Sequence, residues 1–313
     1  MSGFTITAGV SFSGGFTFTE APSENTAAWF GGGGPFAPFR ETVQRITFAT
    51  DTNTASVRGP LSSARKTLAA AGNTTDGWFG GGYGPNPGTS SSTVDRITYA
   101  TDTATASVRG PLSQGRYALA AAGNTTDGWF GGGQGPQSSI HRITYATDTA
   151  TASLRGPLSL AWLGPAAAGN TTDGWFGAGQ TPSVVSTVQR ITYATDTATA
   201  SVRGPLSSAR YRLAAAGNQT YGWFNGGIAF STVDRITWAN DTATASVRGP
   251  LSAATQYSAA AGNSTDGWFG GGGFFTTVST VNRITYATDT ATASTRGPLS
   301  GSWGMMAAAG GMQ

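Results

Sequence analysis

The sequence has no cysteine, a single histidine and three glutamates. Without cysteine, disulfides and thiolate chemistry are excluded. One histidine, His141, falls short of the ligand clusters that metal sites use, so we expect a solvated loop residue, no metal and no cofactor. Glycosidases need two carboxylates that face each other across a pocket. Most aspartates here lie in turn motifs, where they bond their own backbone, so we expect no enzymatic activity.

Charge is also scarce. Charged residues make up 11% of the 313 residues and the net charge is +3. No basic cluster is present, which argues against nucleic-acid binding. No apolar run approaches the roughly 20 residues that a membrane helix needs, so we expect no membrane insertion. The N-terminus lacks the basic region and compact apolar core of a signal peptide.

The chain is instead built from one repeated unit. One copy is GWFGGGYGPNPGTSSSTVDRITYATDTATASVR, at 77–109. The tryptophan before phenylalanine recurs at Trp29, Trp78, Trp129, Trp175, Trp223 and Trp268. The tetrapeptide RGPL begins at Arg58, Arg109, Arg155, Arg203, Arg248 and Arg296. A sixfold repeat of this period indicates an array of identical supersecondary units.

Each copy contains four strand-like pieces. In one copy they are Ala-rich 68–72, aromatic 78–82, alternating 94–99 and short 105–109, with Gly, Asn, Asp and Pro between them. Four short antiparallel strands repeated at this length are one propeller blade. We therefore predict an all-β fold, a six-bladed β-propeller of four-stranded antiparallel blades. The small first strand suits the crowded axis.

The two ends of the repeat region predict how the ring closes. The last AAAG, at 307–310, has no Trp-Phe strand after it, and the first Trp-Phe strand, at Trp29, has no AAAG before it. We expect residues 301–311 to supply the innermost strand of the first blade, which removes sheet edges. Residues 27–313 form the propeller, and residues 1–26, which lack the repeat, form an extended anchoring arm.

Differences among the repeats divide the ring into two faces. All insertions fall between the second and third strands, and the links between blades also vary. Both segments emerge on one face, here called the varied face. Aromatic and basic side chains on loops of a rigid scaffold suit recognition of a ligand. The predicted ligand-binding residues are Phe36, Phe39, Arg40, Tyr83, Tyr117, Trp162, Tyr211, Arg212, Phe230, Tyr257, Phe274, Phe275 and Trp303.

The opposite face, here called the constant face, carries the repeated turns GNTTDG and ATDTAT. Its aspartates are expected to form a sixfold acidic rim that docks on a partner protein. A hexameric partner on the same axis could make a similar contact with each blade. The predicted docking residues are Asp102, Asp148, Asp196, Asp241 and Asp289.

Over residues 27–311 the layout resembles kelch-type propellers: glycines end the second strand, an aromatic closes the third, and a proline link follows the fourth. It departs from them because the tryptophan sits on the second strand. The units ITYATDTATASVRGPLS and the N-terminal SGGFTFTEAP look like propeller-containing structural proteins of tailed phages, particularly of marine cyanobacteria. That resemblance implies a virion location, other virion proteins as partners, and an adhesin for a host-surface glycan or receptor. The alternatives are a purely structural capsid or tail protein and a glycan-processing enzyme.

Overall fold

The computed structural model describes residues 25–34, 38–85, 89–273 and 276–310. The predicted arm therefore lies almost wholly outside the described residues, as do Phe36, Phe274 and Phe275. Within the described residues, strands form six antiparallel four-stranded sheets. No helix among them is long and apolar enough to cross a membrane.

The strands occupy four concentric positions. The innermost strands are β4 (Ala69–Gly72), β8 (Ala120–Gly123), β12 (Ala166–Gly169), β16 (Leu213–Gly217), β20 (Ala259–Gly262) and β24 (Ala307–Gly310). The second strands are β1 (Ala27–Gly31), β5 (Asp76–Gly80), β9 (Asp127–Gly131), β13 (Asp173–Thr181), β17 (Tyr221–Gly226) and β21 (Asp266–Gly270). The third strands are β2 (Val43–Thr47), β6 (Val94–Thr98), β10 (Ile140–Thr144), β14 (Ser183–Thr192), β18 (Val233–Thr237) and β22 (Val281–Thr285).

The outermost strands are β3 (Ser56–Arg58), β7 (Ser107–Arg109), β11 (Ser153–Arg155), β15 (Ser201–Arg203), β19 (Ser246–Arg248) and β23 (Ser294–Arg296). A short 3-10 turn follows each third strand: η1 (Phe48–Thr50), η2 (Tyr99–Thr101), η3 (Tyr145–Thr147), η4 (Tyr193–Thr195), η5 (Trp238–Asn240) and η6 (Tyr286–Thr288). The second strand of blade 2 runs from Asp76 to Gly80, two residues earlier than expected, because Gly81 and Gly82 adopt φ of 72° and 106°.

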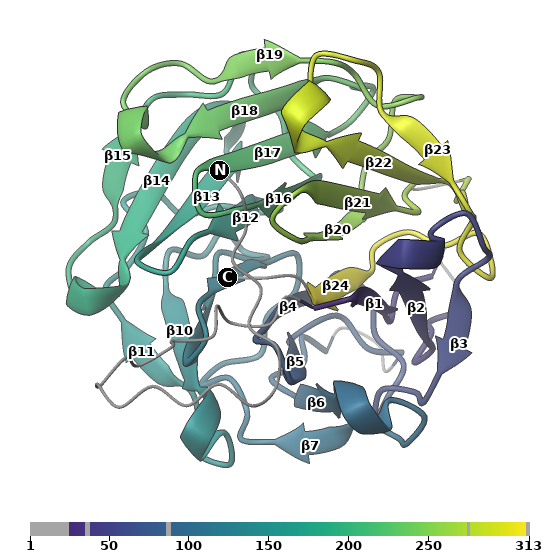
Figure 1. Cartoon of the computed structure of the whole chain (residues 1–313). Coiled ribbons are helices and arrows are strands. Elements are labelled where there is room, and N and C mark those ends of the chain that lie inside the picture. Colours follow the sequence, from purple (N-terminus) through teal and green to yellow (C-terminus); the bar gives the residue numbers. More distant parts are fainter. Residues whose placement is uncertain (1–24, 35–37, 86–88, 274–275, 311–313) are drawn as a thin grey trace, which may run out of the picture.

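Figure 1 shows the six sheets as blades around a central axis, with the alanine-rich innermost strands nearest the middle. Blade 1 has the order β24-β1-β2-β3, and blades 2 to 6 follow in sequence. Strand β24 pairs antiparallel with β1, with Ala307 opposite Gly31 and Gly310 opposite Ala28. The predicted six-bladed fold and its closure by a C-terminal strand are thus confirmed.

The hydrophobic core lies between neighbouring blades. The tryptophan of each second strand stacks on an aromatic ring of the next blade, with centroids 3.7 to 3.9 Å apart and planes within 12°. Trp78, for example, stacks on Tyr145 at 3.8 Å. Such pairs contribute about 0.5–1.5 kcal/mol each beyond the area they bury.

Ion pairs join each blade to the next at the same place. Asp148 of blade 3 accepts a hydrogen bond from Trp78 Nε1 at 2.9 Å and lies 3.1 Å from Arg96 Nη1 and 3.4 Å from Arg109 Nε, all in blade 2. All six junctions repeat this arrangement, and Asp51 closes the ring with Trp268, Arg283 and Arg296 of blade 6. The repeated arginines thus pair with aspartates across every junction between blades.

These contacts overturn the predicted acidic rim. The five predicted docking residues are between 5% and 8% exposed, and each carboxylate is held between two arginines and a tryptophan of the preceding blade. A carboxylate so placed is neutralised and cannot meet a partner. The predicted docking role is therefore wrong for Asp102, Asp148, Asp196, Asp241 and Asp289.

The glycine of RGPL marks a close approach between blades. A Cβ on Gly110 would lie 1.9 Å from the carbonyl oxygen of Ala150 in the next blade, and the Gly110 amide donates to the Asp148 carbonyl at 2.8 Å. The corresponding glycines of the other five junctions meet the same obstacle at 1.9 to 2.1 Å. No side chain fits at this position, which accounts for the repeated glycine.

Candidate binding site at the axial mouth

Six residues, one from each link between blades, form a closed ring of backbone hydrogen bonds around the axis on the varied face. Each amide donates to the carbonyl of the preceding ring residue, at 2.6 to 2.9 Å. All six adopt the left-handed conformation, with φ between 54° and 64°. The ring residues are Thr67, Ala118, Gly164, Arg212, Tyr257 and Met305.

The ring carries backbone strain. The left-handed region costs a residue with a side chain roughly 1–2 kcal/mol, whereas glycine enters it freely. Glycine nevertheless stands at one ring position, Gly164, and the other five hold side chains. Strained residues of this kind cluster at functional sites.

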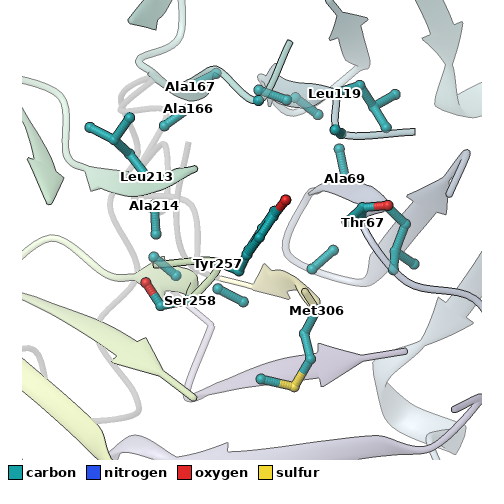
Figure 2. A pocket seen from close by; sticks show the side chains of 18 of the residues that line it. Thr67, Ala69, Leu119, Ala166, Ala167, Leu213, Ala214, Tyr257, Ser258 and Met306 are labelled. Atoms are coloured by element: carbon teal, nitrogen blue, oxygen red, sulfur yellow. The ribbon is translucent and has the colours of Figure 1, made fainter. Parts of the chain in front are cut away.

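A pocket of about 110 Å³ opens inside the ring, on the propeller axis. Its walls are the alanines of the innermost strands, and Tyr257 projects toward its centre (Figure 2). Small side chains at Thr67 and Ala118, with Gly164, form one half of the mouth, and the larger Arg212, Tyr257 and Met305 form the other. The described residues that line this pocket include no Asp, Glu or His.

Arg212 lies between two aromatic rings at the mouth. Its guanidinium carbon is 4.6 Å from the ring centroids of both Tyr211 and Tyr257, and Nη1 donates to Gln256 Oε1 at 3.3 Å. Burial raises the pKa of Tyr257, and the nearby Tyr211 and Tyr117 add to the rise while Arg212 opposes it. The phenol therefore stays neutral near pH 7 and acts as a hydrogen-bonding group.

A second aromatic cluster lies on blades 1 and 2 and on the links that follow them. Tyr83 meets Tyr117 edge-on at 5.0 Å and Phe39 at 5.9 Å. The ammonium of Lys66 lies 4.7 Å from the Phe39 ring centroid. Burial raises the pKa of Tyr117 and lowers that of Lys66.

The structure thus brings together Phe39, Tyr83, Tyr117, Tyr211, Arg212 and Tyr257 from the predicted set. Other predicted residues lie elsewhere on this face: Arg40 stands 5.9 Å from the Trp303 ring, and Phe230 lies 5.8 Å from Arg210. Trp303 is half-buried against a blade core.

Trp162 was predicted as a ligand-binding residue, and this is wrong. Its side chain is 0% exposed and belongs to the core between blades 3 and 4, with Trp129 and Phe176. Its place in the link matches Arg65, which is also buried. The Trp162 side chain therefore points between the blades and cannot reach a ligand on the varied face.

His141 also differs from the expectation of a solvated loop residue. It lies on β10 and is 1% exposed, and its Nδ1 accepts from the Ser113 amide at 3.1 Å. Its Nε2 faces the guanidinium of Arg116. Burial, and then the charge of Arg116, lower the pKa of His141 to about 4.

Sequence reasoning missed Lys66, Gln256 and the ring residues Thr67 and Met305. A signal was present: each ring residue stands two positions after the link residue that aligns with Trp162, as Thr67 follows Arg65. Aligning the six links would have isolated this column.

Within the described ranges, no group of three or more His, Cys, Asp or Glu side chains could hold a metal ion. Neither a protein-family profile nor a curated protein matches the sequence. Solved structures do resemble it. One described as "Structure of YjhT" shares 12% identity, with a TM-score of 0.69 over 88% of this chain and 95% of that chain. At this identity the likeness concerns the fold alone.

Proposed function

We propose that this protein is a non-enzymatic binding module that holds a host-surface glycan or receptor at the axial mouth of its varied face. One observation carries the proposal: five of the six left-handed ring positions keep side chains where glycine would relieve strain. A fold under no functional demand gains nothing from that cost. Tyr257 and Arg212, the two largest polar side chains of the ring, stand at the pocket.

The chemistry of the mouth suits a saccharide. Flat rings at Tyr257, Tyr117 and Tyr83 offer stacking surfaces for the apolar faces of sugars. Neutral phenols, the Arg212 guanidinium and the Gln256 amide supply directional hydrogen bonds. Because no carboxylate or imidazole among the described residues lines the pocket, the lining favours binding over hydrolysis.

The proposed setting is the virion of a tailed phage. This rests on the resemblance of the repeated units to structural proteins of tailed phages. The face on which the described chain begins is compatible with an N-terminal anchor. Strand β1 begins, and β24 ends, on the constant face, where Asn25 donates to the Asn73 carbonyl at 2.9 Å. The described part of the chain therefore begins on that face, and we propose that the arm, residues 1–26, anchors the propeller to other virion proteins. The near-identical turns of the constant face suit a hexameric partner on the axis.

Replacing Tyr257 by glycine tests the proposed site. Tyr257→Gly removes the central ring and relieves the left-handed backbone, so binding should fall at least about tenfold while stability is kept or rises. Wild type and variant would be compared on a printed glycan array and in adhesion to whole host cells. Ala118→Gly is the matched control, because it relieves the same strain and removes only a methyl group.

Three results would contradict the proposal: a wild-type protein that retains neither glycans nor cells, a Tyr257→Gly variant that binds as wild type does, or an Ala118→Gly variant that loses binding equally. Attachment to virion partners through the varied face would instead support the purely structural alternative.

A further inference from the structure

A hollow lies at the constant face where blade 1 meets blade 2. Asn25, Ala27, Trp29, Arg45 and Thr47 of blade 1 line it together with Tyr99 of blade 2. It has a volume of about 330 Å³. It is far from the axial mouth in the fold, because these residues belong to the constant-face ends of the strands.

Four other blades show what normally fills this place. In blade 2, Asp76 starts the second strand opposite Thr98, accepts from Thr98 Oγ1 at 2.5 Å and lies 3.6 Å from Arg96 Nε. Blades 3, 4 and 6 repeat this, with Thr Oγ1 at 2.6 Å and Arg Nε at 3.5 Å from the carboxylate. The carboxylates belong to Asp127, Asp173 and Asp266.

In blade 1 the carboxylate is missing but its donors are kept. Ala27 stands opposite Thr47, as Asp76 does opposite Thr98. Arg45 keeps the pose of its counterparts through Asp102, 3.0 Å from Nη1. Its Nε is buried and makes no hydrogen bond among the described residues, as is also true of the equivalent arginines. In blades 2, 3, 4 and 6, however, an aspartate oxygen lies 3.5 to 3.6 Å from that Nε, and blade 1 has no such ion pair at this place among the described residues.

The numbers of arginines and carboxylates at the junctions also indicate that blade 1 lacks a negative charge. At the junction of blades 2 and 3, Arg96 and Arg109 meet two carboxylates, Asp76 and Asp148. At the junction of blades 1 and 2, two arginines meet one described carboxylate, Asp102. One positive charge is therefore left without its usual counterpart. Blade 5 also lacks the aspartate, but there Tyr221 covers Arg235 at 4.4 Å.

We propose that this hollow is a carboxylate-binding site, in which Arg45 Nε and Thr47 Oγ1 hold the group that an aspartate supplies in four sister blades. In the sister blades the carboxylate accepts a hydrogen bond from the threonine hydroxyl and forms an ion pair with the guanidinium, and the two contacts together hold it in a defined geometry. The carboxylate can come from Glu20 or Glu24 of the same chain, which precede Asn25, or from a separate ligand. The site is independent of the axial mouth.

The test follows the arginine Nε–H resonances of the full chain during titration with sodium acetate, with sodium chloride at equal ionic strength as the reference. Arg45 should shift saturably with acetate and not with chloride. Ala27→Asp should remove that response, because the new side chain fills the site. Asp76→Ala should create a second site, so that Arg96 also responds.

The glutamates decide the source of the carboxylate. If acetate does not shift the Arg45 resonance in wild type but shifts it in the Glu20→Gln/Glu24→Gln variant, the chain's own glutamate fills the site, and the proposal stands. If wild type responds, the site accepts a separate carboxylate. Silence of Arg45 in both proteins, or an unchanged response in Ala27→Asp, overturns the proposal.

Discussion

Replacing His141 by aspartate should stabilise the protein. The position equivalent to His141 holds Asp95 in blade 2 and Asp234 in blade 5. Asp95 Oδ2 accepts both from the Ser62 amide at 3.3 Å and from Arg65 Nη2 at 2.6 Å. Asp234 accepts from the Ser207 amide and from Arg210 in the same way.

A histidine cannot do the same. A neutral imidazole has one acceptor nitrogen, and the Ser113 amide uses Nδ1. The other nitrogen then carries a hydrogen toward Arg116, whose guanidinium is buried and bonds Ser139 and the Gly132 carbonyl but no carboxylate. Burial lowers the pKa of Arg116 to about 10.

The gain in free energy of unfolding follows from the acceptor that Arg116 lacks beside His141. One recovered hydrogen bond to a charged group is worth about 1.5–3 kcal/mol, and burying a new carboxylate offsets part of it. His141→Asp should therefore raise the free energy of unfolding by about 1–2 kcal/mol at pH 7, or Tm by roughly 1.5–3 °C. Chemical and thermal denaturation measure both. Asp95→His, which builds the unfavourable pair in blade 2, should cost a similar amount.

The pH dependence gives an independent check. The pKa of His141 is lowered from 6.5 to about 4 in the folded protein. Between these values the unfolded chain binds a proton that the folded chain does not, so stability falls as the pH drops from 6.5 toward 4. The full difference between the two pKa values corresponds to at most about 3.4 kcal/mol. We expect about half of it, because protein interiors respond to charge as a medium of higher dielectric constant.

His141→Gln, which does not titrate, should lack this component. The reasoning is refuted if His141→Asp is no more stable than wild type at pH 7, or if the difference between wild type and His141→Gln does not change between pH 6.5 and 4.

The remaining predictions concern the scaffold. Gly110→Ala should destabilise by more than about 2 kcal/mol, because its Cβ would meet the Ala150 carbonyl oxygen at 1.9 Å, whereas Gly84→Ala, with open space around it, should be near neutral in the same denaturation assay. Asp148→Asn should cost about 2–4 kcal/mol by removing the carboxylate that Arg96 and Arg109 share; an unchanged urea midpoint would contradict the stabilising role given to this carboxylate. Deleting residues 305–313 should lower Tm sharply, since β1 loses its partner strand, and equal melting of the truncated and full chains would argue against that closure.

The fold could be predicted from the sequence because the repeat is nearly exact in spacing. The tripeptide Arg-Ile-Thr recurs in every third strand, and its arginine precedes the arginine of RGPL by 13 positions in all six copies. This constant spacing fixes the third and fourth strands together. The unpaired AAAG at the end and the unpaired Trp-Phe at the start identified the closing strand. These are local and periodic features, and tertiary contacts do not override them.

The site was predicted less well because burial depends on contacts between blades. Asp148 in a Thr-Asp-Thr turn has a sufficient local explanation, so nothing in its own repeat indicates Trp78 and Arg96 of the preceding blade. Trp162 looks like an exposed loop aromatic until its link is aligned with the one that holds Arg65. His141 is understood as a buried residue only once the same register places it beside Arg116.

The hydrogen-bonded ring at the mouth has a consequence for how this surface can change over evolution. Main-chain atoms alone make the ring, and threonine, alanine, glycine, arginine, tyrosine and methionine already occupy equivalent places in it. Residue identity at these places is therefore uncoupled from the architecture that presents them. Selection, or a combinatorial library at the six codons, could exchange the ligand while the propeller stays as it is.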